Sequence, residues 1–191
     1  MSATAIFLRG INLGRRRLTN EELKEPFVDA GFGEVQTFIA SGNLVVGDAT
    51  KRPGEGEEAS SESALAALEA RVEKVVQKSF GFQADAFARP LMQLAELVDA
   101  KLIGEGEAAG FTPHVIFLKA APDAAAVQAL GTLETEGDRF PVLDEQVIWL
   151  RRGGLSDSTV EQRHLEKALG GVPNTMRKVT TLRRMVAKFA G

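Results

Sequence analysis

In the first half of the chain the apolar residues follow two kinds of spacing, which alternate several times along the sequence. Short continuous or alternating apolar runs are typical of strands, whereas apolar residues three and four apart are typical of a one-sided helix. The first helix is expected to begin at Thr19, because Thr19 and Glu22 can form a capping box, and to stop at Gly31. The expected elements are a strand over 4–8, this helix, strands over 35–40 and 43–46, a helix over 63–79 and a strand over 82–88. This β-α-β-β-α-β order predicts a ferredoxin-like unit.

The second half of the chain repeats this plan. The segment "HVIFLKA" carries at 116–119 the Ile-Phe-Leu-basic core that "TAIFLRG" carries at 6–9, which indicates an internal repeat. The expected elements are a helix from Pro90, a Gly- and Glu-rich loop, the "HVIFLKA" strand, a helix from Pro122 with Val127 and Leu130 inward, strands over 139–143 and 146–150, and helices over 159–169 and 180–189.

The predicted fold class is therefore α+β, with two ferredoxin-like halves in tandem. We place the first half at residues 1–89 and the second at residues 90–191. No clear strand is visible between the last two predicted helices, so the second half can be incomplete, with a C-terminal helix in place of its last strand.

Composition narrows the functional classes. The 191 residues are 44% hydrophobic and 26% charged, as in ordinary globular proteins, and the formal net charge of -3 argues against a protein coated in positive charge. The sequence has no cysteine, which excludes disulfides, thiolate zinc sites, iron–sulfur clusters and a cysteine nucleophile. Because no apolar stretch has the length of a signal peptide or of a membrane span, we expect a cytoplasmic protein without a membrane partner. The acidic segment over 47–61 is expected to be a solvated loop.

The segment "LRGINLGRRR" over 8–17 brings glycines and arginines together just before a helix. Gly10 and Gly14 permit a sharp turn with accessible N–H groups, and the arginines at 15–17 add positive charge, so the segment has the ingredients of an anion site. Its spacing matches no recognised nucleotide fingerprint. The alternative is a connection whose arginines are simply solvated.

The turn "ASGN" at 40–43 joins the two predicted hairpin strands. Ser41 and Asn43 could hydrogen-bond a ligand from this rigid position. Turn chemistry favours the same residue types, however, and is the better explanation here.

The segment "NTMRKVTTLRR" over 174–184 is the third candidate for ligand binding. Five basic residues and no acidic one lie between Gly171 and Gly191. Guanidinium and hydroxyl groups, together with the N–H groups of a helix start, can hold a phosphate. The alternative is an amphipathic end helix whose basic residues complement the helix dipole.

Other catalytic constellations are not visible in the sequence. No constellation of paired carboxylates stands out, since Glu161 and Glu166 are five residues apart on their predicted helix and do not share a face. No set of metal ligands is visible either, so neither a metal nor a cofactor is expected. The only histidines are His114, in a buried-looking strand, and His164, in a predicted helix, and we interpret both as structural or surface residues.

Together these motifs resemble a mainly bacterial family, the domain-of-unknown-function family 1697. The resemblance lies in "LRGINLG", "TFIASGNLVV", "HVIFL", "DRFPV" and "LEKALGGVPNTMRKVTTLRRM", and it covers nearly the whole chain. It implies a pair of ferredoxin-like halves and supplies no established activity. The matching residues are Leu8, Arg9, Gly10, Ile11, Asn12, Gly14, Ser41, Gly42, Asn43, Thr175, Arg177 and Thr180.

Two positions depart from the family pattern. Lys178 stands where members usually have asparagine, which adds a positive charge and removes an amide acceptor. The stretch "GGLSDSTVE" replaces a glycine-rich, lysine-bearing stretch, so a ligand role of that stretch is not carried over to this chain.

In a ferredoxin-like unit the first and third strands are neighbours, so residues 9–12 are expected near Asn43. The leading hypothesis is that the three motif segments converge in an electropositive cleft. The cleft would bind an anionic ligand, either a phosphate-bearing metabolite, a nucleotide or RNA. The candidate ligand-binding residues are Arg9, Gly10, Asn12, Ser41, Asn43, Thr175, Arg177, Lys178 and Thr180.

Two other classes of function remain open. An enzyme would use the same cleft for group transfer on a phosphorylated substrate, with Arg9, Arg177 and Lys178 as electrophilic clamps. In a purely structural protein, the motifs would only fix turns and the contact between the halves.

Overall fold

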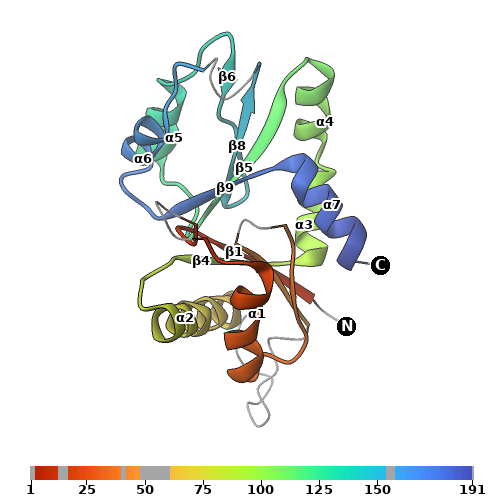
Figure 1. Cartoon of the computed structure of the whole chain (residues 1–191). Helices are drawn as coiled ribbons and strands as arrows, with labels where there is room; N and C mark the ends of the chain where they lie inside the picture. Colours follow the sequence, from red (N-terminus) through yellow and green to blue (C-terminus); the bar gives the residue numbers. More distant parts are fainter. Residues whose placement is uncertain (1–2, 13–16, 40–41, 48–60, 154–157, 191) are drawn as a thin grey trace. The chain divides into compact units, whose positions relative to one another are not determined.

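The structure is a computed structural model, and it describes residues 3–12, 17–39, 42–47, 61–153 and 158–190. It is a mixed α+β structure with two antiparallel sheets and, within those residues, seven helices (Figure 1). The chain divides into two compact units, which we call unit 1 (Met1–Leu94 with Met185–Gly191) and unit 2 (Ala95–Arg184). The division into halves at 1–89 and 90–191 stays a prediction.

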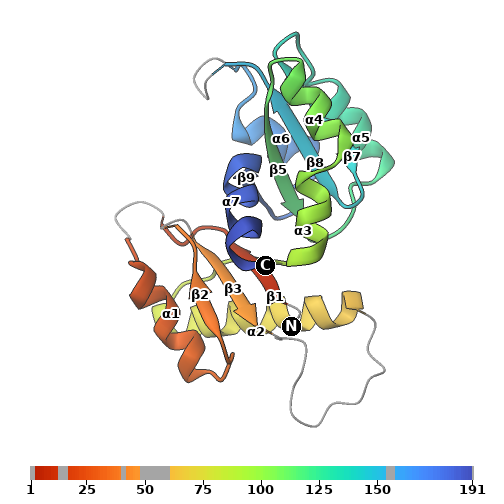
Figure 2. The same cartoon turned by 90° about the vertical axis from the view of Figure 1, so that its right-hand side faces the viewer.

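Unit 1 contains an antiparallel sheet with the strand order β2-β3-β1-β4, in which β1 is central and β4 lies at an edge. Its elements are β1 (Ala3–Leu8), α1 (Asn20–Asp29), β2 (Val35–Thr37), β3 (Asn43–Gly47), α2 (Ser61–Phe80) and β4 (Ala86–Pro90), followed by α3 (Leu91–Val98), which crosses into unit 2. Helices α1 and α2 lie side by side against one face of this sheet (Figures 1 and 2).

Local sequence signals determine where α1 begins. Thr19 is its N-cap, and the predicted capping box is present, because the N–H of Glu22 donates to Thr19 Oγ1 (3.2 Å) and the N–H of Thr19 donates to Glu22 Oε2 (2.8 Å). Gly31 follows the helix with φ = +72°, the left-handed conformation that glycine adopts without strain. The prediction for this helix is confirmed.

Helix α2 buries a regular apolar face against the sheet. Leu68, Val72 and Val76 lie on this face, at most 4% exposed, and pack with Ile6 and Leu44 of the strands. This spacing of four residues is the one that the sequence pattern predicted for the helix. The same spacing places Glu69, Glu73 and Gln77 together on a second, polar face.

Unit 2 contains an antiparallel sheet with the order β6-β8-β5-β9, to which β7 adds a short pairing with β8. Its elements are α4 (Lys101–Ala108), β5 (Thr112–Leu118), α5 (Ala124–Gly131), β6 (Asp138–Arg139), β7 (Val142–Leu143), β8 (Gln146–Arg151), α6 (Gln162–Ala168), β9 (Asn174–Lys178) and the first part of α7 (Val179–Phe189). Helices α5 and α6 cover one face of the sheet, and α4 packs on the other (Figure 1).

A strand does follow α6, which corrects the expectation that the last strand of the second half could be missing. Strand β9 pairs antiparallel with β5, from His114 opposite Lys178 to Leu118 opposite Asn174. The sequence pattern does not predict this strand, because its buried positions include the polar residues Asn174 and Thr175 and therefore show no apolar periodicity.

Two further expectations for unit 2 are wrong. The Gly- and Glu-rich segment forms helix α4 instead of a loop, and Gly106 lets this helix approach Leu150 of β8 closely. Val127 does not face inward but is 43% exposed, because α5 buries only Leu130 against the core.

The C-terminal end of α7 belongs to unit 1. There the ring of Phe189 meets the ring of Phe38 edge to face, with 5.8 Å between the centroids. Over the described part of the chain, no helix combines the length and the apolar character that a membrane span requires.

Candidate functional site: a pocket at the end of strand β1

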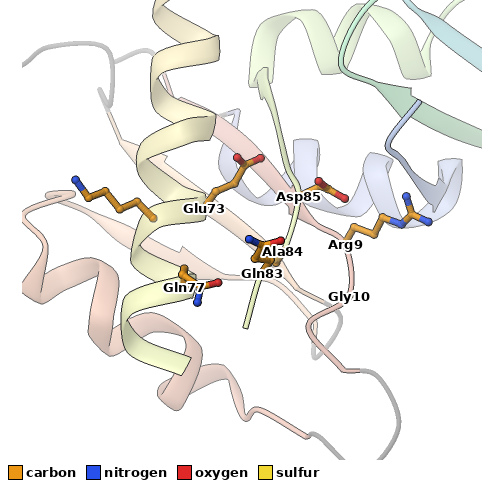
Figure 3. Close-up of a pocket in the computed structure, with 8 residues that line it drawn as sticks. Arg9, Gly10, Glu73, Gln77, Gln83, Ala84 and Asp85 are labelled. Carbon is orange, nitrogen blue, oxygen red and sulfur yellow. The ribbon is translucent and has the colours of Figure 1, made fainter. Parts of the chain in front are cut away.

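Unit 1 carries an open polar pocket of about 570 Å³ where β1 ends (Figure 3). Three segments line it: the end of β1, the polar face of α2, and the connection from α2 to β4. The lining residues are Arg9, Gly10, Glu73, Lys74, Gln77, Gln83, Ala84 and Asp85.

The pairing of β1 with β4 places two of these segments side by side. The two strands are antiparallel, so Leu8 at the end of β1 lies opposite Ala86 at the start of β4. One residue further, the N–H of Arg9 donates to the carbonyl oxygen of Asp85 (2.9 Å). Figure 3 shows the side chains of Arg9 and Asp85 extending to the same side from these neighbouring segments.

Two carboxylates of α2 fix the helix to the edge strand β4. The N–H of Ala86 donates to Glu73 Oε1 (2.9 Å), and the N–H of Ala88 donates to Glu69 Oε1 (2.7 Å). Glu69 is only 8% exposed, and besides the N–H of Ala88 its carboxylate contacts Arg89, whose Nη1 lies 3.8 Å from Glu69 Oε1. The wall formed by α2 is therefore held at a defined distance from the wall formed by the strands.

The pocket combines positive, negative and neutral polar groups. Arg9 and Lys74 are cations, Glu73 and Asp85 are carboxylates, and the remaining polar side chains are two primary amides. Among the described residues, no hydrogen bond or ion pair engages the side chains of four of these residues, namely Lys74, Gln77, Gln83 and Asp85. Such groups can contact a ligand without giving up an existing bond.

Of the first predicted motif, Arg9 and Gly10 line the pocket, whereas Asn12 does not. The Oδ1 atom of Asn12 accepts the N–H of Leu18 (2.9 Å), a bond that ties the end of the motif to the start of the first helix. Gly14 and the arginines at 15 and 16 lie outside the described residues.

The "SGN" turn lies beside the first motif, as the neighbouring strands predicted. Gly42 accepts the N–H of Leu8 through its carbonyl (2.8 Å), and a Cβ atom at Gly42 would stand 3.2 Å from the carbonyl oxygen of Leu8. Asn43 is fully buried, and its Nδ2 donates to the carbonyl of Phe38 (3.0 Å), which closes the turn. Neither residue lines the pocket, and Ser41 lies outside the described residues.

The third motif forms strand β9 and the start of α7 in unit 2. Arg177 Nη1 donates to Thr175 Oγ1 (2.8 Å) and to the carbonyl of Met176 (2.9 Å). Burial lowers the pKa of Arg177 to about 10, so this guanidinium keeps its positive charge at neutral pH. Lys178 and Thr180 are exposed. The predicted convergence of all three motifs in one cleft stays a prediction.

Most residues of the pocket escaped the sequence analysis. Glu73, Lys74 and Gln77 look like the solvated face of an amphipathic helix, and Gln83 and Asp85 look like part of a strand over 82–88. That strand in fact begins only at Ala86. One signal could have revealed them: in the predicted β-α-β-β-α-β unit the first and last strands are antiparallel neighbours, so the segment before the last strand lies beside the end of the first.

Neither histidine contributes to the pocket. His114 is buried in the sheet of unit 2, where its Nδ1 contacts the carbonyl of Thr112 (3.1 Å), and His164 Nδ1 accepts the N–H of Glu161 (3.1 Å) at the start of α6. Within the described ranges, no three His, Asp or Glu side chains come together in a way that could hold a metal ion.

Comparisons with known proteins place the chain in a family. In structure it is similar to the conserved bacterial protein SP0830 from Streptococcus pneumoniae, with a TM-score of 0.65 and 18% sequence identity over 97% of each chain, a likeness that concerns the fold alone. No curated protein sequence matches it. Residues 1–149 match the family described as Protein of unknown function (DUF1697). Since this match covers most of the 191 residues and includes the "LRGIN" and "SGN" motifs, the chain belongs to the DUF1697 family.

Proposed function

We propose that unit 1 binds a small phosphate-bearing ligand in the pocket between β1, α2 and β4. The observation that carries the proposal is that Arg9 of the first motif and Lys74 of α2 line the same pocket. Guanidinium and ammonium groups are the side chains that bind phosphate most strongly, through charge-assisted hydrogen bonds. The volume of about 570 Å³ lies within the usual range for small-molecule sites.

The two carboxylates of the pocket balance its formal charge. Glu73 already accepts the N–H of Ala86, so its negative charge is partly satisfied inside the protein. An anion would therefore gain from direct contact with Arg9 and Lys74, and not from a general positive field. We expect a binding site of modest affinity, in which contacts with individual side chains supply the binding energy.

A thermal-shift titration with inorganic phosphate and phosphorylated metabolites tests this proposal. A ligand that binds the folded state raises the melting temperature with concentration. We expect Lys74→Ala to reduce the shift strongly, and Lys78→Ala to leave it unchanged, because Lys78 lies one turn further along α2 and outside the pocket. Equal shifts in both variants would overturn the proposal.

A second candidate function is group transfer on a phosphorylated substrate. It is favoured by the position of the Asp85 carboxylate, which lies beside Arg9 in the same pocket. Asp85 could act as a general base while Arg9 stabilises the charge on the transferred group. Release or transfer of phosphate from a bound substrate, abolished in Asp85→Asn even at saturating substrate, would favour the enzyme. Binding without turnover in the unaltered protein would favour the first function.

We further propose that both units are ferredoxin-like. The support is that each unit follows a β-α-β-β-α-β order, with β6 and β7 together in the second position of unit 2. In each sheet the first and third strands are central neighbours and the fourth strand lies at an edge. An experimental structure of the chain tests this assignment.

The remaining motif residues stay candidates for ligand contacts. Asn12 and Ser41 are such candidates in unit 1; Thr175, Arg177, Lys178 and Thr180 are separate candidates in unit 2. The buried side chain of Asn43 is used in its own turn. Arg177→Ala tests the second group: if it lowers the affinity for phosphate compounds while Lys167→Ala, at an exposed position of α6 outside this segment, does not, the third motif takes part in binding.

A further inference from the structure

This inference rests on the proposed function and concerns the chemical class of the ligand. We propose that the pocket of unit 1 selects a sugar phosphate or polyol phosphate over a nucleotide. The ligand would place its phosphate on one of the two cations, Arg9 or Lys74, and its hydroxyl groups on the carboxylate and amide side chains.

The first argument is the hydrogen-bonding character of the lining. Apart from the two cations, the pocket offers the carboxylates of Glu73 and Asp85 and the primary amides of Gln77 and Gln83. Carboxylates only accept hydrogen bonds, whereas amides both donate and accept. Hydroxyl groups are suited to both, because each hydroxyl donates one hydrogen bond and accepts others.

The second argument is the placement of these groups on two walls. Glu73 and Gln77 project from α2, and Asp85 projects from the segment beside β1, with Gln83 between them (Figure 3). Acceptors therefore lie on more than one side of the pocket, which suits a ligand with several hydroxyl groups along its length. A bare phosphate could satisfy only the cations and would be repelled by the carboxylates.

The third argument is that the described lining residues include no aromatic side chain on which a nucleobase could stack. None of the eight lining residues is aromatic. The nearest aromatics in the sequence, Phe80 and Phe82, stack on each other with 6.0 Å between ring centroids and pack against the core of unit 1. Stacking on aromatic side chains supplies much of the affinity of proteins for bases, so this pocket gains little from one.

Calorimetric titration of the whole chain with ribose 5-phosphate, AMP, inorganic phosphate and ribose tests the inference. We expect ribose 5-phosphate to bind at least about tenfold more tightly than inorganic phosphate or ribose, and AMP to bind no more tightly than ribose 5-phosphate. AMP binding tenfold more tightly than ribose 5-phosphate would overturn this inference and leave the proposed function standing. Equal affinities for ribose 5-phosphate and inorganic phosphate would also overturn it.

Two variants separate hydroxyl recognition from phosphate recognition. Asp85→Asn keeps the backbone bond to Arg9 and removes only the carboxylate, so we expect it to weaken ribose 5-phosphate about tenfold without weakening inorganic phosphate. Gln83→Ala, at an exposed position, should likewise weaken the binding of ribose 5-phosphate without weakening that of inorganic phosphate. Lys74→Ala should weaken the binding of both compounds alike, with Lys78→Ala as the control.

If Asp85→Asn weakens the binding of inorganic phosphate as much as that of ribose 5-phosphate, the inference fails. If none of the phosphate compounds binds, the proposed function fails with it.

Discussion

Glu73 of helix α2 accepts the backbone N–H of Ala86, the first residue of the edge strand β4, at 2.9 Å. One turn earlier in the helix, Glu69 accepts the N–H of Ala88. The helical spacing of four residues thus matches the strand spacing of two, because one helical turn and two strand residues span similar lengths. This match links the pocket wall to the sheet.

We predict that Glu69→Ala destabilises unit 1 by about 1–3 kcal/mol, because it leaves the N–H of Ala88 without its acceptor in a buried place. Hydrogen exchange of the Ala88 amide should accelerate, while amides in the centre of β1 keep their protection. Glu69→Gln retains an acceptor oxygen and should therefore destabilise unit 1 less than Glu69→Ala. An unchanged exchange rate at Ala88 in Glu69→Ala would contradict the role of this carboxylate.

Gly106 and Gly104 of helix α4 offer a matched pair of substitutions. A Cβ atom at Gly106 would lie 2.7 Å from Leu150 Cδ2, whereas a Cβ atom at Gly104 meets nothing within 4 Å. We therefore expect Gly106→Ala to destabilise unit 2 by about 1–3 kcal/mol through overpacking, and Gly104→Ala to stabilise it by about 0.5–1 kcal/mol. Urea unfolding followed by fluorescence of Trp149, the only tryptophan, measures both. Equal effects of the two substitutions would show that α4 is not packed this closely.

Stability of unit 2 should fall as the pH drops below 6.5. Burial lowers the pKa of His114 below this ordinary value, and the nearby charges of Arg151 and Lys178 lower it further. The unfolded chain then binds a proton before the folded one does, so the stabilising contribution is present above pH 6.5 and is lost as the pH falls through the depressed pKa.

Thermal unfolding monitored at Trp149 over this pH range tests the prediction, since the rings of His114 and Trp149 are 6.2 Å apart. The slope of stability with pH should flatten in His114→Gln and persist in His164→Gln, which leaves His114 in place. A slope that survives in His114→Gln would assign the effect to another group.

Arg183 of α7 and Glu107 of α4 form a bidentate ion pair, with Nη1–Oε1 at 2.6 Å and Nη2–Oε2 at 3.0 Å. The Nη2 atom of Arg183 also donates to the carbonyl of Val98. We expect a coupling energy of about 1 kcal/mol between Arg183 and Glu107 in a double-mutant cycle, because the pair is partly exposed to solvent. Arg183→Lys should lose most of this coupling energy, since an ammonium cannot form both bonds in the planar geometry of the guanidinium. Additive effects of the single substitutions would exclude the coupling.

The elements with local signals could be predicted from the sequence. The capping box at Thr19 and the apolar face of α2 depend on residues within a few positions of one another, and the structure confirms both. Strand β9 could not be predicted in this way. Its buried Asn174 is satisfied through its side chain, which accepts from Gln162 and donates to the carbonyl of Val172. Only the folded arrangement reveals these partners.

The candidate site was predicted in part, for a similar reason. Arg9 and Gly10 stand in a distinctive motif, so they could be selected from the sequence. Lys74 and Asp85 are ordinary surface charges in the sequence. The pairing of β1 with β4, and the bonds from β4 to Glu69 and Glu73 of α2, bring their segments together. Asn43 was selected for its polar side chain, but that side chain is used to close its own turn.

The carboxylates along β4 also bear on how the protein behaves at high concentration. An edge strand normally presents free N–H groups on which the strand of another molecule can add, and growing stacks of such strands lead to aggregates. At Ala86 and Ala88 these groups are already occupied by charged side chains of the same molecule. An incoming strand would have to displace one of these carboxylates to pair there, so this edge of unit 1 resists intermolecular sheet growth without a covering strand of its own.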